Sequence, residues 1–185
     1  MLIANEVEDW WKKSKKKGNI LKLDFEKAYD SINWEFLLAM VRNFGFGVKW
    51  IRWMKACIST TMVSVLVNGA STEEFQPQTG LRQGDPLSPF LFIIAVEGLN
   101  LLLARAKVLG LCRGSTVGSN DVSVSHIQFA DDTIIFCEGD IEDISNIKRA
   151  LRCFEVMAGL RINYHKSVVC GVGVQEDQTK EFAKV

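Results

Sequence analysis

The chain of 185 residues is long enough for one large domain, and its 48% hydrophobic and 24% charged residues are typical of a globular protein with a core. Its 22 basic and 22 acidic residues give no net charge, which argues against a protein that binds nucleic acid through overall charge alone. The charge is unevenly spread, because residues 1–60 carry 11 basic and 7 acidic side chains, whereas residues 61–185 carry 11 and 15.

Neither secretion nor membrane insertion is indicated by the sequence. Residues 1–11 hold three acidic side chains and no long apolar run, unlike a signal peptide. The longest apolar stretch, residues 90–104, is interrupted by Glu97 and Asn100, which favours a buried core helix over a membrane span. Five scattered cysteines without a CxxC pair predict reduced thiols. We therefore expect an intracellular protein, in the nucleus or the cytoplasm, with no membrane partner.

The N-terminal segment is predicted to form a helix followed by a strand. The helix covers residues 2–17 and should end at the Gly18-Asn19 pair. The lysines at its end suit the negative pole of the helix, and they either lie in solvent or contact a phosphate backbone. Residues 20–24 are mostly apolar and predict a short strand that ends at Asp24.

Two further helices are predicted before residue 60. Ser31 or Asn33 can cap the first of them, and the second spans residues 48–58. Trp34 and Trp50 fall on the apolar faces of these helices. We expect these tryptophans in the core rather than as platforms on which a ligand stacks.

The middle of the chain is expected to contain a hairpin, a loop and a long helix. Residues 61–76 alternate around Asn68-Gly69, which is the strongest short signal for a hairpin. Residues 79–89 form a loop rich in glycine and proline that leads into a helix over residues 90–107. Residues 109–121 are crowded with turn formers and are predicted to be a loop.

A second hairpin is predicted over residues 125–137, where two apolar runs flank the adjacent carboxylates of Asp131 and Asp132. Adjacent aspartates repel each other, so their place at the tip of a hairpin needs a reason. A solvated turn is one reason, because aspartate tolerates turn conformations. A hard divalent cation such as Mg²⁺, which binds carboxylate oxygens, is the other.

The C-terminal part is predicted to hold one helix and two short strands. The helix covers residues 142–157 and ends at Gly159. Residues 160–163 and 168–169 are expected to be strands. Residues 173–185 are predicted to be a polar tail or a truncated end.

With the 61–76 hairpin set aside as an insertion, the order of elements predicts an α+β fold with a split β-α-β-β-α-β antiparallel sheet. In that topology the first strand is the neighbour of the 125–137 hairpin. Asp24, at the end of the first strand, is therefore expected to approach Asp131 and Asp132. This inference depends on topology alone.

Three converging carboxylates cannot all stay ionised without cations between them. Two Mg²⁺ ions bridged by aspartates are the usual arrangement for phosphoryl transfer. No Ser/His/Asp arrangement competes, because His126 and His165 are the only histidines and neither has an obvious partner. We expect both histidines to be structural or to face solvent.

Four segments, in this order, resemble motifs A, B, C and D of reverse transcriptases, most closely those of non-LTR (LINE-type) retrotransposons and with a likeness to plant elements. They are Leu23–Ser31 (LDFEKAYDS), Gly80–Pro89 (GLRQGDPLSP), Phe129–Asp132 (FADD), and Gly159–Asn163 (GLRIN) with Lys166-Ser167. Each motif alone is moderately specific, whereas four in order at these separations are highly specific. The resemblance covers roughly residues 3–172.

The resemblance implies a polymerase palm with part of the fingers over residues 1–172, with the helices on one face of the sheet. Asp24 and Asp131 would be the main ligands of two Mg²⁺ ions, for which Mn²⁺ could substitute, and Asp132 would complete the triad. The carbonyl of Phe25 could add a ligand. Lys166 would be a candidate proton donor to the pyrophosphate, although a surface lysine is the plain alternative.

Four other residues would line the nucleotide and template pocket by the same resemblance. Tyr29 would be the gate that rejects the ribose 2′-hydroxyl, or else an aromatic anchor at the start of a helix. Gln83 and Gly84 would contact nucleotide and template, and Gly84 would permit close approach of the backbone. Arg82 would contact phosphate or template.

The implied activity is RNA-directed DNA polymerisation, in which a dNTP is joined to the 3′-hydroxyl of a DNA primer on an RNA template. Most of the basic fingers, the thumb and an endonuclease are absent from the sequence and are expected on a longer parent polyprotein. The alternative is an incompetent remnant, a degenerate copy that keeps the palm but lacks a grip on its substrates. A maturase or an RNA-dependent RNA polymerase is disfavoured by Tyr29 together with the residues 83–89.

Overall fold

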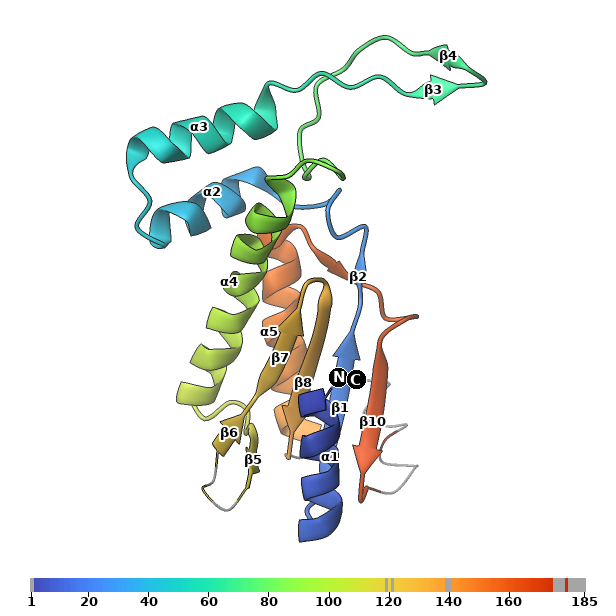
Figure 1. The fold of residues 1–185 in the computed structure, drawn as a ribbon. Helices are drawn as coiled ribbons and strands as arrows, with labels where there is room; N and C mark the ends of the chain where they lie inside the picture. Colours follow the sequence, from blue (N-terminus) through green and yellow to red (C-terminus); the bar gives the residue numbers. More distant parts are fainter. Residues whose placement is uncertain (1, 119, 121, 139–140, 175–178, 180–185) are drawn as a thin grey trace.

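A computed structural model describes residues 2–118, 120, 122–138, 141–174 and 179 (Figure 1). Helices and groups of strands are interspersed along the chain, and a central sheet runs along the long axis of the molecule. The elements are α1 (Leu2–Ser14), β1 (Gly18–Leu23), β2 (Phe25–Glu26), α2 (Trp34–Asn43), α3 (Val48–Ser59), β3 (Leu66–Val67), β4 (Ala70–Ser71), α4 (Ser88–Val108), β5 (Ser115–Val117), β6 (Val122–Val124), β7 (His126–Phe129), β8 (Asp132–Cys137), α5 (Ile141–Ala158), β9 (Arg161–Ile162) and β10 (Val168–Val172).

The main sheet has four antiparallel strands in the order β10-β1-β8-β7. When only the four strands of this sheet are numbered along the chain, their order in the sheet is fourth, first, third and second. This is the split β-α-β-β-α-β arrangement. The predicted α+β fold is therefore confirmed, and β1 is the neighbour of the β7–β8 hairpin as expected. The predicted polar tail over residues 173–185 lies almost entirely outside the described residues.

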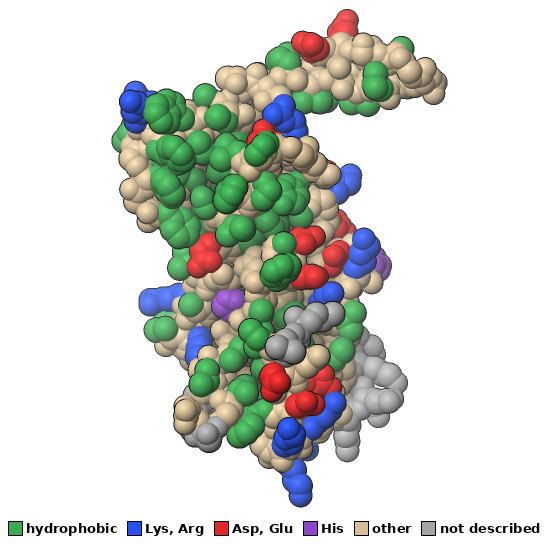
Figure 2. Space-filling view, viewed as in Figure 1, with side chains coloured by type: hydrophobic (Ala, Val, Ile, Leu, Met, Phe, Trp, Pro, Cys, Tyr) green, Lys and Arg blue, Asp and Glu red, His purple; other side chains and the backbone are tan. Residues whose placement is uncertain are grey.

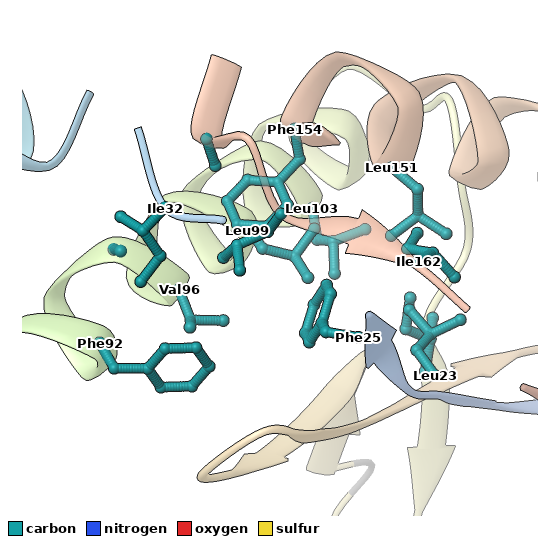
Figure 3. Close-up of a cluster of buried hydrophobic side chains, with 14 of the residues drawn as sticks. Leu23, Phe25, Ile32, Phe92, Val96, Leu99, Leu103, Leu151, Phe154 and Ile162 are labelled. Atoms are coloured by element: carbon teal, nitrogen blue, oxygen red, sulfur yellow. The ribbon is translucent and has the colours of Figure 1, made fainter. Parts of the chain in front are cut away.

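The larger core lies between the sheet and the helices α4 and α5 (Figure 3). Alternate residues of β1, such as Leu21 and Leu23, point to this face, because the side chains of a strand alternate between its two sides. Phe92 and Leu99 of α4 and Phe154 of α5 pack into the same core. This packing fixes the sheet against the two helices and so positions the ends of the strands.

The opposite face of the sheet is covered in part by α1, so the helices are not confined to one face. Trp11 of α1 is fully buried, and its ring meets that of Phe136 edge to face at 6.3 Å. The prediction that Gly18 ends this helix was wrong. The helix ends at Ser14, and Gly18 belongs to β1, where a Cβ atom would lie 2.6 Å from the Trp11 ring.

Glu138, after β8, links α1 to the sheet and is expected to make stability depend on pH. Burial raises the pKa of its carboxyl, but hydrogen bonds from the Thr116 N–H, Ser115 and Trp11, together with the charge of Lys16, outweigh burial and lower the pKa below 4.5. A lowered pKa stabilises the folded state above the unfolded value, and this stability is lost as pH falls through the folded value.

We expect Glu138→Gln to lower the free energy of unfolding at pH 7 by about 1–2 kcal/mol, because charge-assisted hydrogen bonds are lost. The difference from the wild type should shrink as pH falls below 4.5, and it should vanish once pH has passed through the lowered pKa of the folded wild-type carboxyl. Urea unfolding at pH 7 and pH 4 would measure both effects. The exposed Glu6→Gln is the matched control; a Glu138→Gln effect independent of pH would contradict the expectation.

The helices α2 and α3 form the upper part of the molecule with the β3–β4 hairpin (Figure 1). Asn33, one of the two predicted caps, caps α2 by accepting hydrogen bonds from two backbone N–H groups. The Asn68-Gly69 turn has positive φ at both residues, as the hairpin prediction requires. Trp50 is 41% exposed, so its predicted place in the core was wrong, because α3 buries only the side that carries Met54.

Of two predictions about the middle of the chain, the loop over residues 109–121 was wrong and the buried core helix is confirmed. The segment 109–121, expected to be a loop, contains β5, which pairs with β6, because Gly118 at φ +82° allows the chain to reverse. The helix α4 has the length and apolar composition of a membrane span. It packs in the core through residues such as Val96 and Leu103, as expected for a buried helix.

Candidate active site

The tip of the β7–β8 hairpin carries the two adjacent aspartates. Phe129 and Asp132 form the last cross-strand pair, so Ala130 and Asp131 make a two-residue turn. Ala130 has φ +53°, a conformation that costs a residue with a Cβ about 1–2 kcal/mol. Asp131 and Asp132 are both exposed. The turn is thus a strained structure that presents two carboxylates to solvent.

Asp24 lies beside this turn, as the topology predicted. Leu23 at the end of β1 pairs with Thr133 of β8, so the next residues along the two strands, Asp24 and Asp132, are cross-strand neighbours. Asp24 is half-buried, in contrast to the exposed pair at the tip. The backbone therefore brings the predicted carboxylates to one edge of the sheet.

The side chains of the three aspartates do not gather into one cluster. The Lys22 ammonium lies 3.2 Å from Asp132 Oδ1, and both side chains are about half exposed. Within the described residues no group of three or more acidic, histidine or cysteine side chains is arranged to hold a metal ion. A cation at this edge would need the carboxylates to turn toward it, and Lys22 is the cation that the Asp132 carboxylate contacts instead.

The backbone of Asp24 is held on both sides by the segment between β9 and β10. Its N–H donates to Ser167 Oγ at 3.1 Å, and its carbonyl accepts from the Asn163 N–H at 2.8 Å. Sequence reasoning placed Asn163 and Ser167 in motif D without giving them this function. No local pattern predicts it, because the residues lie about 140 positions from Asp24.

Ser167→Ala is expected to lower turnover by more than its small loss of unfolding free energy explains. It removes one acceptor, which should cost about 1 kcal/mol of unfolding free energy, and it frees the Asp24 backbone to shift. Ser145→Ala is the control, because it removes a serine hydrogen bond to a helix carbonyl far from the site. Urea unfolding and turnover measured on both variants would separate the effects; equal loss of activity in the two would contradict a role in positioning Asp24.

Lys166 and Phe25 occupy different surroundings. Lys166 is exposed on the same turn as Ser167, and its side chain contacts no partner among the described residues. Its assignment as a proton donor and its alternative as a surface lysine therefore both stay predictions. The Phe25 ring is buried in the core, 6.3 Å from the Phe154 ring. The Phe25 carbonyl is next to Asp24 because the two residues are adjacent in the chain. The Phe25 backbone pairs with Ile162 of β9, which fixes its position.

The loop before α4 is fastened to the segment that follows Asp24. The Gly80 N–H donates to the Ile32 carbonyl at 2.8 Å, and the Leu81 N–H donates to the Tyr29 carbonyl at 2.6 Å. The Trp34 indole N–H donates to the Gly80 carbonyl at 2.6 Å. These bonds fix motif B against motif A, so the loop and the strand end form one unit.

Within this loop the predicted contact residues are held in different ways. Arg82 pairs with Asp85 at 2.7 Å, and the pKa of Asp85 is lowered by the Leu87 N–H and by Arg82. Gln83 lies 3.5 Å from an Asp30 oxygen. Gly84 has φ +87°, and a Cβ there would meet open space, so its conformation, not crowding, favours glycine. The Arg82 side chain is 59% exposed and contacts Asp85 through one guanidinium nitrogen, so its other N–H groups remain accessible.

Tyr29 lies between the loop and the turn. Its ring stacks on Phe92 of α4 with centroids 4.9 Å apart and planes 18° apart. It also lines a pocket of about 460 Å³ that Gln128 and Phe129 close from the side of the turn. The aromatic anchor is therefore present, and the anchored ring is at the same time the wall of a cavity beside the carboxylates.

A second, larger groove of about 790 Å³ opens on the other side of the loop, toward α3 and the β3–β4 hairpin. Its polar wall includes Lys27 and Asp30, which sequence reasoning did not single out, and Arg82 and Asp85. Lys27 has φ +45°, which marks a sharp bend directly after β2. The only hint of Lys27 in the sequence was its position three residues after Asp24, within the segment that resembles motif A.

The surroundings of the two histidines do not indicate a catalytic role for either of them. His126 Nδ1 lies 2.9 Å from Ser125 Oγ, and burial lowers the pKa of its imidazole. His165 is exposed on the β9–β10 turn.

The acidic end of the hairpin is visible on the molecular surface. Figure 2 shows acidic side chains at the height at which Figure 1 places the β7–β8 turn, beneath a broad hydrophobic surface.

Comparison with known proteins agrees with this arrangement. A model of the family described as reverse transcriptase (RNA-dependent DNA polymerase) matches residues 4–182. The chain is 31% identical over 150 residues to an uncharacterized 149 kDa protein of transposon TX1 from Xenopus laevis, which covers 80% of this chain and 11% of that protein. It is 27% identical over 179 residues to a Pol polyprotein of the R2 retrotransposable element from Popillia japonica, covering 94% of this chain and 24% of that protein.

Solved structures of similar fold include telomerase from Candida tropicalis in a complex with a fragment of telomeric RNA. The TM-score is 0.66 at 16% sequence identity, over 92% of this chain and 28% of the telomerase chain. At this identity the likeness shows the fold alone. The chain spans about a tenth to a quarter of the lengths of the TX1 and R2 proteins.

Proposed function

Because the chain belongs to the reverse transcriptase family, whose model matches nearly its whole length, we propose that it is the palm of an RNA-directed DNA polymerase. The predicted kinship with LINE-type elements is confirmed by the family match together with the TX1 and R2 relatives. The observation that carries the proposal is the register that sets Asp24 beside Asp132 and the Asp131 turn.

The proposed cofactor is a pair of Mg²⁺ ions, with Mn²⁺ as a substitute. The donor set fits, because Asp24, Asp131 and Asp132 offer hard carboxylate oxygens at one edge of the sheet. When bound, such ions lower the pKa of the attacking hydroxyl and stabilise the leaving group. The chain's own part is to hold Asp24 through Ser167 and to release Asp132 from Lys22.

The proposed substrates are an RNA template, a DNA primer and a dNTP. The cavity beside Tyr29 extends to the turn that carries Asp131, whereas the groove beside Lys27 lies across the loop from it. Both support binding of a nucleotide, on one side or the other of the loop. Arg82 is a candidate phosphate ligand through the guanidinium N–H groups that do not contact Asp85. Fingers, thumb and endonuclease on a longer parent polyprotein, and an intracellular location, remain parts of the proposal.

Primer extension tests the proposal directly. The purified chain is incubated with a labelled DNA primer on an RNA template and dNTPs, with Mg²⁺, with Mn²⁺, or with EDTA. Extension that requires a divalent ion is expected. The alternative, a remnant that keeps the fold without activity, predicts a folded chain that binds Mg²⁺ and extends nothing, and that result would overturn polymerase activity for this chain.

Tyr29→Ala is expected to raise incorporation of ribonucleotides by about tenfold or more, because the pocket wall that would exclude the 2′-hydroxyl is removed. Tyr29→Phe keeps the ring and its stacking on Phe92, so it should retain the selectivity of the wild type. Extension with rNTPs and dNTPs in parallel measures the ratio. If the alanine variant is as selective as the wild type, Tyr29 is an anchor only.

A further inference from the structure

The segment 36–72 is free of acidic residues, although the chain as a whole has no net charge. It carries four basic residues, Arg42, Lys49, Arg52 and Lys55, so its charge is +4 and that of the remaining chain is −4. All four side chains are exposed. Three of them lie on α3, so this helix presents a positive surface to solvent.

The same helix exposes aromatic rings. Trp50 is 41% and Trp53 51% exposed, and the Phe46 ring stacks on Trp50 with centroids 6.0 Å apart and planes 17° apart. The Lys49 ammonium lies 5.0 Å from the centre of the Trp53 ring. Figure 2 shows the broad hydrophobic surface over α2, α3 and the start of α4, with basic side chains at its upper edge.

Helical spacing gathers these groups on one side of α3. Lys49, Arg52, Trp53 and Ala56 recur at the i, i+3, i+4 and i+7 positions of one face, and all four are exposed. Met54 is buried on the other side. Trp50 borders this face and lines a groove of about 370 Å³ between α3 and the start of α4. Cations and rings therefore share one continuous surface.

We propose that this basic–aromatic face of α3 binds single-stranded nucleic acid. Lys49 and Arg52 would contact phosphates, and Trp53 and Trp50 would stack on unpaired bases. A duplex hides the faces of its bases, so stacking selects a single strand. Tryptophan and arginine also occur in protein interfaces, but the +4 charge of the segment 36–72, which has no acidic residue, favours a polyanion as the partner. The proposal goes beyond polymerisation, since such binding needs neither a divalent ion nor a triphosphate.

Fluorescence anisotropy with labelled 20-nucleotide oligo-U and oligo-dT, in EDTA and without dNTPs, tests the proposal. Trp53→Ala is expected to weaken binding about tenfold, and Trp53→Phe to restore most of it, because a ring still stacks. The double variant Lys49→Ala/Arg52→Ala should make the dependence of log affinity on log salt shallower by about 1.4. Tryptophan fluorescence should be quenched on binding, and less so in Trp53→Ala.

The charge-matched control is Lys148→Ala/Arg149→Ala, which removes two exposed cations from α5. It should leave affinity for the oligonucleotides within about twofold. Comparable binding of oligo-U and oligo-dT, or a preference for one, supports the proposal and identifies the strand. Wild-type affinity in Trp53→Ala, equal losses in the control, or tighter binding of a duplex would overturn it. Asp131→Asn should bind normally, so failure of polymerisation and failure of this surface are distinguishable.

Discussion

Asp131→Asn is expected to reduce primer extension by about a hundredfold or more while the fold and nucleic-acid binding persist. Loss of a group that only supports a metal ligand costs about 10–100-fold, so loss of a ligand should cost at least as much. Asparagine keeps the shape of the side chain and removes the charge. The turn should become no less stable, because Asp131 lies next to Asp132 and the repulsion between them is relieved.

The same loss is expected for Asp24→Asn, because the register places this carboxylate beside Asp132. Since the two act on one site, the double variant should lose little more than either single variant. Asp9→Asn, an exposed aspartate on α1, is the control and should keep full activity. Initial rates of extension measure the loss of activity, and urea unfolding shows whether the fold persists. Wild-type rates in Asp131→Asn would show that Asp131 does not belong to the active site.

Gly80→Ala is expected to lower the free energy of unfolding by about 3 kcal/mol or more. The left-handed conformation at φ +83° costs a residue with a Cβ about 1–2 kcal/mol. In addition the Cβ would lie 2.5 Å from the Asp30 carbonyl oxygen, so the backbone itself must move, and displaced backbone adds to the cost. The loop carrying Arg82 and Gln83 would shift with it, and extension should fall as well.

Gly110→Ala isolates the conformational part of that cost. Gly110 also has positive φ, +70°, but a Cβ there would meet no atom within 4 Å. Its variant should lose only about 1–2 kcal/mol and keep its activity. Denaturant unfolding of both variants measures the difference, and equal losses would show that the contact between Gly80 and Asp30 is not rigid.

Much of the fold could be predicted because its signals are local. The Asn68-Gly69 turn, the alternation around the Asp131-Asp132 pair and the cap at Asn33 depend on a few neighbouring residues each. The order of the elements then left one plausible sheet, in which Asp24 meets the hairpin. Motif order pointed to the same polymerase family that the family model matches.

Other features could be decided only by the tertiary structure, because they depend on which distant elements meet. Ser167 holds Asp24 from about 140 residues away, and Lys22 lies on Asp132. Gly18 reads as a helix stop, yet it is a strand residue that makes room for Trp11. Trp50 has the spacing of a core residue, yet no described element covers it fully. Periodicity shows which face of a helix is apolar, whereas burial depends on what packs against that face.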